Sequence, residues 1–248
     1  MQCKCSPYHL SEIFLQANLN EIDKALVNKL FDVVHKVHRG EKLFTSGDNF
    51  KSIFTVRSGF FKSSFLSSDG FEQITGFHMT GEMLGLDGIA TNHHTCIAVA
   101  LEDSSVYEIK FSKLLELTLQ IKGLQHNINK ILSSEIIRHQ NEIMILGRMH
   151  TEERLAVFLM DLSARLHARG YSKHELILKM KREDIAGFLG MKNETLSRAL
   201  SKMMHEGIID VDRNSIKIVN MELLHSAGKK NMKSEFLNSM SKREMCLV

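Results

Sequence analysis

The stretch from Glu183 to Leu200, EDIAGFLGMKNETLSRAL, constrains the fold more than any other part of the chain. Apolar residues recur at helical spacing on both sides of Gly190, and a glycine at that point permits a tight turn between two helices. The stretch therefore predicts a pair of short helices, each with one buried face. The residues expected in the core are Ile185, Ala186, Leu189, Leu196, Leu200 and Met203.

The opposite face of the second predicted helix is polar and carries Glu194, Ser197, Arg198 and Lys202. In a helix whose start enters the major groove, arginine suits guanine O6 and N7, glutamate accepts from cytosine N4, and serine reaches a base. Lys192, Thr195 and Lys202 are suited to hold phosphates, which sets the register without reading sequence. In isolation, Glu194 and Arg198 would instead form an ordinary i,i+4 ion pair on a surface helix. The core spacing, the glycine turn and the hairpin that follows favour DNA reading.

The segments around this helix pair complete a recognisable order. TEERLAVFLMDLSARLHARG predicts a helix that Thr151 caps and Gly170 ends. ELILKM is typical of a strand, and IIDVD and SIKIV, joined at Arg213–Asn214, predict a hairpin. Helix, helix, turn, helix and hairpin is the order of a winged helix-turn-helix, which we place over residues 150–228. Residues 229–248 have the composition of a weakly ordered tail.

The first part of the chain predicts a β-domain. Eight of the 15 glycines lie between Gly40 and Gly88, and between them stand β-branched and aromatic runs such as KSIFTV, GFFKSSFL and EQITGFHM. Short strands separated by turn residues are typical of an antiparallel sandwich or barrel. Further strands are expected up to Phe111, and the apolar spacing within residues 10–36 predicts a helix before them. We therefore expect an N-terminal arm and a β-domain over residues 1–111.

Residues 112–149 predict one long helix with a narrow apolar stripe. Such a helix either packs on the β-domain or pairs with a second copy of the chain. We favour pairing, because the stripe is too regular to leave in water. His139 lies on the stripe, where a tolerated, partly buried histidine is expected rather than a pH sensor. The residues expected at the pairing surface are Leu124, Ile128, Leu132, Ile136, His139, Ile143 and Leu146.

Composition and charge limit the class of protein. The net charge is +3, and residues 181–248, with 12 Lys/Arg against 9 Asp/Glu, carry the whole excess, which is compatible with a nucleic-acid partner. No uncharged apolar run can span a membrane, and MQCKCSPYHL at the N-terminus lacks the apolar core of a secretory signal. Four irregularly spaced cysteines do not make a disulfide framework, so we expect a cytoplasmic location.

Two other classes of function are weighed against a DNA-binding regulator. No nucleophile–base motif, phosphate loop or HExxH pattern is present, so no enzyme is expected. The other alternative is a sensor whose winged domain binds a protein partner.

Four long stretches resemble the Crp–Fnr family of bacterial transcription regulators, and its Fnr-like branch in particular. They are GEKLFTSGDNFKSIFTVRSGFFKS, DGFEQITGFHMTGEMLGLDGI, EERLAVFLMDLS and REDIAGFLGMKNETLSRAL, and the resemblance runs from about residue 10 to residue 225. It implies an α+β fold with an N-terminal cyclic-nucleotide-binding-like β-roll, a long dimerisation helix and a C-terminal winged helix-turn-helix. It also implies a homodimer that binds double-stranded DNA at an inverted repeat.

The resemblance also implies roles for particular residues. In the Fnr-like branch the pattern E-x-x-S-R reads a TTGAT-type half-site, and the pattern falls on Glu194, Ser197 and Arg198. Asn193 stands where members like the cyclic-AMP receptor have an arginine that contacts DNA, which moves the expected site toward the Fnr type. Family activators touch RNA polymerase through surface loops, and we expect the loop around Asp69–Gln73 to take part.

The family's nucleotide ligand does not fit the residues of this chain. Cyclic-AMP binders follow a Gly-Glu turn with an Arg-Ser pair that holds the phosphate. Here Gly81–Glu82 supplies the turn, but HHTCIAVA replaces the Arg-Ser region. We therefore expect no control by a cyclic nucleotide.

An Fnr-type [4Fe–4S] cluster does not fit either, because it takes four cysteine thiolates. Cys5 matches one ligand, but Tyr8, Phe14 and Tyr107 take the places of the others. The cysteines out of register are Cys3, Cys96 and Cys246. Three histidines that we expect in exposed loops rather than as substitute ligands are His9, His93 and His94. We expect no cofactor and no metal; the alternative is an Fnr-type redox or oxygen sensor with a cluster, or with a thiol switch at an exposed cysteine.

Overall fold

The computed structural model of the protein describes residues 21–67, 70, 72–121 and 123–229. The chain forms two compact units, residues 1–138 and residues 139–248. The division falls inside helix α4 (Leu124–Arg148), and not at either end of the segment 112–149 that was predicted as one helix.

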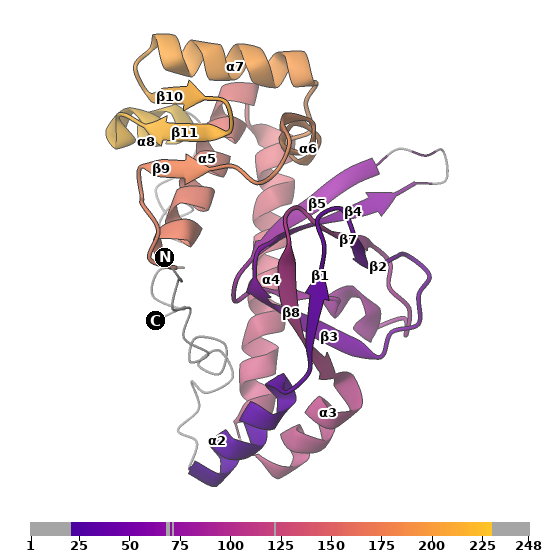
Figure 1. Ribbon diagram of the computed structural model, residues 1–248. Helices are drawn as coiled ribbons and strands as arrows, with labels where there is room; N and C mark the ends of the chain where they lie inside the picture. Colours follow the sequence, from indigo (N-terminus) through magenta and orange to yellow (C-terminus); the bar gives the residue numbers. More distant parts are fainter. Residues whose placement is uncertain (1–20, 68–69, 71, 122, 230–248) are drawn as a thin grey trace. The chain divides into compact units, whose positions relative to one another are not determined.

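The N-terminal unit contains two four-stranded antiparallel sheets (Figure 1). One sheet has the strand order β1-β8-β3-β6, and the other has the order β2-β7-β4-β5. The strands are β1 (Val34–Val37), β2 (Lys42–Phe44), β3 (Ser52–Ser58), β4 (Phe60–Leu66), β5 (Glu72–Met79), β6 (Met83–Leu84), β7 (Ile97–Ala100) and β8 (Ser104–Lys110). The antiparallel architecture predicted from the short β-rich runs is confirmed.

Residues from both sheets meet in one apolar core, since alternate side chains of a strand point to the same side. Val56 of β3 and Phe61 of β4 are completely buried there. Gly59 joins these two strands with φ +96°, and a Cβ at this position would collide with Ser104, so the turn requires glycine. The members of this core are Val37, Phe44, Val56, Phe61, Leu84, Ala98, Ala100 and Val106.

A second apolar core in the same unit includes Ile53 of β3, Ile109 of β8 and residues of short helices. These short helices are α2 (Glu21–Asn28), the 3₁₀ turn η1 (Lys29–Phe31) and α3 (Phe111–Gln120). The helix predicted within residues 10–36 is confirmed over residues 21–31, and residues 10–20 lie outside the described part of the chain. Residues 34–36 are not helical: they belong to β1, which pairs with β8 in the register Val34↔Tyr107. Pairing with a distant strand outweighs the local helical spacing here.

The single helix predicted over residues 112–149 is wrong near its start. Helix α3 ends at Gln120, Ile121 is extended, and α4 begins only at Leu124. Gly123 has φ +95°, a conformation that no right-handed helix contains. Ile121 and Leu124 are both buried in the core of their own chain. Leu124 is therefore wrong as a pairing contact, because its side chain has no exposed surface to offer a second chain.

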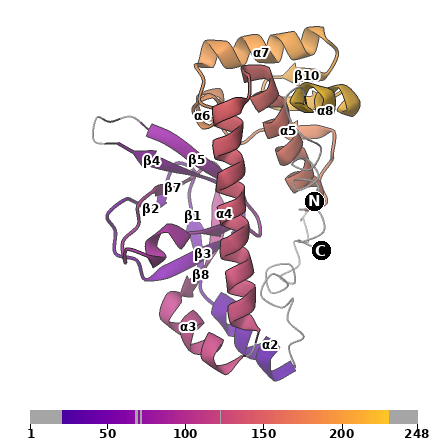
Figure 2. The ribbon, with the colours of Figure 1, turned by 180° about the vertical axis from the view of Figure 1, so that it is seen from behind.

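The C-terminal unit has the predicted order of a winged helix-turn-helix, which Figure 2 shows from behind. Its strands form one antiparallel sheet in the order β10-β11-β9. The elements are α5 (Thr151–His167), β9 (Glu175–Ile177), α6 (Arg182–Phe188), α7 (Asn193–His205), β10 (Ile209–Asp212), β11 (Ser215–Ile218) and α8 (Met221–Lys229). Across the described residues, every helix is too short or too polar to cross a membrane.

The predicted ends of the elements hold, with one correction. Thr151 is the first residue of α5 and not its cap; the carboxylate of Glu153 instead accepts a hydrogen bond of 2.9 Å from the backbone N–H of His150. Gly170 follows the end of α5 with φ +82°, as predicted for a helix stop. The hairpin turns at Arg213–Asn214, where Arg213 has φ +51°.

Candidate nucleic-acid interface

The turn between α6 and α7 is built as the sequence predicts. Gly190 has φ +61°, and its N–H donates to the carbonyl of Gly187 at 3.2 Å. The N–H of Met191 then donates to the carbonyl of Ala186 at 3.0 Å, which closes the end of α6. Lys192 follows in an extended conformation, and its carbonyl accepts the first hydrogen bonds of α7.

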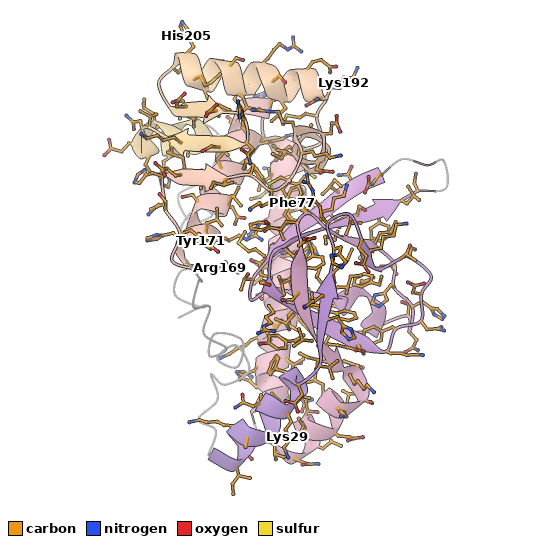
Figure 3. All side chains as sticks on the ribbon, in the orientation of Figure 1. Lys29, Phe77, Arg169, Tyr171, Lys192 and His205 are labelled. Carbon is orange, nitrogen blue, oxygen red and sulfur yellow. The ribbon has the colours of Figure 1, made fainter. Side chains whose placement is uncertain are left out.

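Helix α7 divides into a buried and an exposed face. The residues predicted for the core of the helix pair are all buried, at 5% exposure or less, and Ala199 joins them on α7. Figure 3 labels Lys192 and His205 at the two ends of this helix. The exposed side chains on the polar face are Lys192, Asn193, Glu194, Ser197, Arg198, Ser201 and Lys202, with Thr195 half-buried beside them. Ser201 was missed by the sequence reasoning, although its place four residues after Ser197 puts it on the same face.

Glu194 and Arg198 do not pair with each other. Within the part of the chain that the structure describes, neither side chain makes an ion pair or a hydrogen bond. The ordinary surface ion pair that the four-residue spacing allowed is therefore not formed. The Glu194 carboxylate and the Arg198 guanidinium lie one helical turn apart, beside the Ser197 hydroxyl. Because both charged groups are unpaired, they are available to a ligand that offers hydrogen-bond donors and acceptors.

Lys202 is held differently. Its ammonium Nζ donates to Glu152 Oε1 of α5 at 2.7 Å, and both side chains are about half exposed. This hydrogen bond raises the pKa of Lys202 above its ordinary value, so the lysine is fully charged at neutral pH. A phosphate at Lys202 must compete with the Glu152 carboxylate. The periodicity of the sequence does not indicate this pairing, because the two residues are far apart in the chain.

Basic groups also lie at the wing. Arg182, at the start of α6, donates from Nη2 to the backbone carbonyl of Arg213 at 3.3 Å and so ties the hairpin turn to the helix pair. The side chains of Arg213 and Lys217 are exposed on the hairpin. These three residues were not predicted from the sequence. Arg213 could have been, because it is a basic residue at the turn of a hairpin that follows a helix-turn-helix.

The residues predicted for a pairing surface separate into two groups along α4. Ile136 and Ile143 are 59% and 70% exposed, and Ile137 and Met144, which were not selected, are exposed beside them. Ile128 packs partly against the core of the N-terminal unit, and Leu132 is half-buried. The predicted partly buried His139 is half exposed, with Nδ1 3.3 Å from Glu142 Oε2.

A network around Asp87 occupies the loop where the Arg-Ser pair is missing. The Asp87 carboxylate accepts from the backbone N–H groups of Thr95 at 2.6 Å and Cys96 at 3.2 Å. His94 Nδ1 lies 3.4 Å from the same carboxylate, and its ring stacks on Phe44 with centroids 3.9 Å apart. His94 is only 4% exposed, so its prediction as an exposed loop histidine is wrong, whereas His93 is exposed as expected.

The Asp87 carboxylate is ionised at neutral pH. Burial raises its pKa, but the hydrogen bonds from the Thr95 and Cys96 backbone and from His94 outweigh burial, and the pKa lies below its ordinary value. Two backbone donors of this loop are thus already bound to a fixed negative charge. A phosphate in the same place would meet electrostatic repulsion.

The thiol of Cys96 is partly buried and is protonated at neutral pH. Burial, with the nearby charge of Asp87, raises the pKa of its thiol to about 12, whereas ligation and oxidation both need the thiolate. Tyr107 is buried, with its ring edge against Phe31 at a centroid distance of 5.5 Å. No group of three or more histidine, cysteine or acidic side chains in the described part of the chain is arranged for a metal. The residues outside it are Cys3, Cys5, Tyr8, His9, Phe14 and Cys246.

Two protein-family models match the chain. A cyclic nucleotide-binding domain matches residues 34–120, and a Crp-like helix-turn-helix domain matches residues 153–227. Among solved structures, FixK2 from Bradyrhizobium japonicum is similar, with a TM-score of 0.74, 27% sequence identity, and coverage of 81% of this chain and 98% of that one.

Curated relatives are similar over nearly the whole chain. The fumarate nitrate reduction regulatory protein of Klebsiella oxytoca is 37% identical over 220 residues, which cover 89% of this chain and 88% of the relative. The corresponding protein of Escherichia coli is 36% identical with the same coverage. The transcriptional activator protein Anr of Pseudomonas protegens is 37% identical over 228 residues, or 92% of this chain and 93% of the relative.

Proposed function

The chain belongs to the Crp–Fnr family of DNA-binding transcription regulators, with Fnr and Anr proteins as relatives, and from this premise we propose that it acts as a homodimer on a TTGAT-type inverted repeat. The family is one of regulators and not of enzymes. The observation that carries the proposal is the face of α7 on which Glu194, Ser197 and Arg198 stand exposed, with the two charged groups unpaired.

Each of the three residues has a role in the proposed base reading. Arg198 donates its planar fork to guanine O6 and N7, and Glu194 accepts from cytosine N4. Ser197 contacts a base between them. Lys192 is the residue directly before α7, so its exposed ammonium stands at the start of the helix, where a phosphate fixes the register. Asn193, Thr195 and Lys202 complete the proposed contact surface.

The proposed dimer forms through the exposed apolar residues of α4, which Ile136 and Ile143 dominate. A two-fold axis between the two paired helices gives each chain one half of an inverted repeat. His139 stays in the proposed surface, and Leu146, which is partly buried, lies at its edge, whereas Leu124 does not belong to it.

We propose that neither a cyclic nucleotide nor a [4Fe–4S] cluster controls the protein. The Asp87 carboxylate and the missing Arg-Ser pair oppose phosphate binding, and the Cys96 thiol with a pKa of about 12 opposes ligation. The alternative, a redox or oxygen sensor of the Fnr type, is favoured by the identity of 36–37% to fumarate nitrate reduction regulators. Iron and sulfide assays after anaerobic reconstitution separate the two: about four irons per chain, with loss of DNA binding in air, would support the sensor.

Activation through RNA polymerase is the proposed output, because the relative Anr is a transcriptional activator. The loop around Asp69–Gln73 remains the proposed contact; residues 68, 69 and 71 lie outside the described part of the chain.

The experiment that tests the function is a binding titration with three duplexes: a TTGAT-type inverted repeat, the same repeat with one half-site scrambled, and a fully scrambled duplex. A homodimer that reads bases binds the intact repeat most tightly and the fully scrambled duplex least. Equal affinity for all three would reject base reading, and equal affinity for the first two would reject the two-fold arrangement.

A further inference from the structure

Arg154, in the first turn of α5, makes a set of hydrogen bonds that DNA contact does not explain. Among the residues that the structure describes, its side chain donates to backbone carbonyls alone, and these come from two separate helix ends. The bonds are Nη2 to Leu146 at 2.7 Å, Nε to Met149 at 2.9 Å, Nη1 to Leu189 at 3.0 Å and Nη1 to Gly190 at 3.4 Å.

The first pair of carbonyls belongs to the end of α4. Leu146 lies in the last turn of α4, where backbone carbonyls have no N–H partner within the helix. Met149 is the first residue after α4. The second pair belongs to the turn after α6, at Leu189 and Gly190. Carbonyls at a helix carboxyl end carry partial negative charge, so a cation between two such ends is favourable.

Arginine is the side chain suited to this position. Its guanidinium is planar, always charged and holds five N–H donors in a fixed fork, so it can serve carbonyls on two sides at once. A lysine offers one nitrogen on a flexible stem and can serve one side.

Side-chain packing supports the same connection. A Cβ placed on Gly190 would lie 3.3 Å from Cδ2 of Leu146 and 3.4 Å from Nη1 of Arg154. The last turn of α4 and the turn before α7 are therefore in direct contact, and Arg154 closes that contact with hydrogen bonds. Leu146, which was predicted as a pairing residue, packs toward the helix-turn-helix.

We propose that Arg154 is a positioning residue that fixes the direction of α7 relative to the last turn of α4 and thereby sets the half-site spacing that the protein accepts. The inference rests on the proposed homodimeric base reading. In a two-fold complex the distance between recognition helices must match the distance between half-sites. If α4 forms the pairing surface, the Arg154 bonds lie on the connection between that surface and α7.

The test compares inverted repeats whose central spacer is optimal, one base pair shorter or one base pair longer. One base pair moves a half-site by about 3.4 Å along the axis and turns it by about 35°. Wild-type protein, with rigidly placed helices, should prefer the optimal spacer by about tenfold or more. In Arg154→Gln, which cannot bond both helix ends, that preference should fall below about threefold.

Two controls separate positioning from folding. Discrimination against a half-site with a substituted guanine should survive in Arg154→Gln, because Arg198 and its neighbours are unchanged. Arg165→Gln removes a partly buried arginine of the same helix that pairs with Asp161 one turn away, and it should keep the spacer preference. Arg154→Lys keeps the charge but can hydrogen-bond only one helix end. If Arg154→Gln does not fold, the spacer preference is measured with Arg154→Lys instead.

The outcomes are distinct. Loss of spacer preference with retained base discrimination supports the inference. A spacer preference equal to that of the wild type would overturn it, and so would an equal loss of affinity on every duplex, which reports stability alone. A wild-type protein that does not distinguish the repeat from a scrambled duplex would reject the proposed function, and the inference with it.

Discussion

Arg198→Ala is the substitution that examines the proposed base reading most directly. The Arg198 side chain is exposed and makes no ion pair or hydrogen bond with the described residues, so its removal breaks nothing in the free protein. The free energy of unfolding should therefore change by no more than about 0.5 kcal/mol, as at other surface sites. Any loss in DNA binding then reports the contact itself.

The size of the loss follows from the two-fold arrangement. A bidentate arginine–guanine contact discriminates by about 1–3 kcal/mol, and a homodimer makes two of them. The loss on the inverted repeat should be about 2–6 kcal/mol, which is about 30-fold at the lower end. On a scrambled duplex the same variant should bind nearly as the wild type does.

The assay is a fluorescence-anisotropy titration of both proteins against both duplexes at one fixed salt concentration. Lys192→Ala is the matched control: this lysine is exposed at the start of the same helix, and a phosphate contact should weaken both duplexes alike. If Arg198→Ala lost affinity equally on both duplexes, Arg198 would be a phosphate contact and the base-reading argument would fail.

Three further changes have expected outcomes. Ile136→Glu places a charge in the exposed apolar face of α4 and should shift sedimentation from dimer to monomer and weaken operator binding; a full-weight dimer with normal binding would contradict the pairing surface. Glu152→Gln frees Lys202 from its carboxylate partner and should tighten binding to operator and scrambled duplexes by a similar factor, whereas a change confined to the operator would contradict a phosphate role. Asp87→Asn should lower the free energy of unfolding. Because the folded-state pKa of Asp87 is depressed, this loss should be full near pH 7 and should shrink in urea titrations below about pH 4, and a loss that does not vary with pH would contradict the ionised network.

The sequence predicts the helix-turn-helix well, because local rules govern it. The spacing of Ile185, Leu189, Leu196 and Leu200 identifies both buried faces, and each of these residues is buried. Gly190 marks the turn because its positive φ is the conformation that glycine adopts without strain. The polar face of α7 follows from the same periodicity.

The parts that the sequence predicts poorly depend on distant contacts. The apolar stripe continues from Ile121 into α4 without a change of period, yet one helix ends at Gln120 and the next begins at Leu124 inside the core. His94 stands in a polar loop sequence, but the ring packs on Phe44 from a strand fifty residues earlier in the chain. Arg154 bonds backbone carbonyls, which every residue has, so no pattern of side chains indicates its partners.

The distribution of burial along α4 also sets the strength of the proposed dimer. The first turns are committed to the chain's own core through Leu124 and Ile128, so the exposed apolar surface begins near Ile136. Full burial of an exposed isoleucine contributes about 1.5–3 kcal/mol, and Ile136 and Ile143 are 59% and 70% exposed, so burying what remains contributes about 4–8 kcal/mol for both chains. Association costs about 4–15 kcal/mol at 1 M standard state, so the two terms are of the same size.

A dimer with so small a net gain forms only in part at low protein concentration, and whatever binds the dimer preferentially will shift the equilibrium. An inverted repeat does so, because it offers two half-sites at a fixed distance. We therefore expect dimerisation and operator binding to be coupled, with a sigmoidal binding curve at low protein concentration. A scrambled duplex, which lacks the fixed pair of half-sites, should not promote the dimer to the same extent. A simple hyperbolic curve at concentrations where the free protein sediments as a monomer would contradict this coupling.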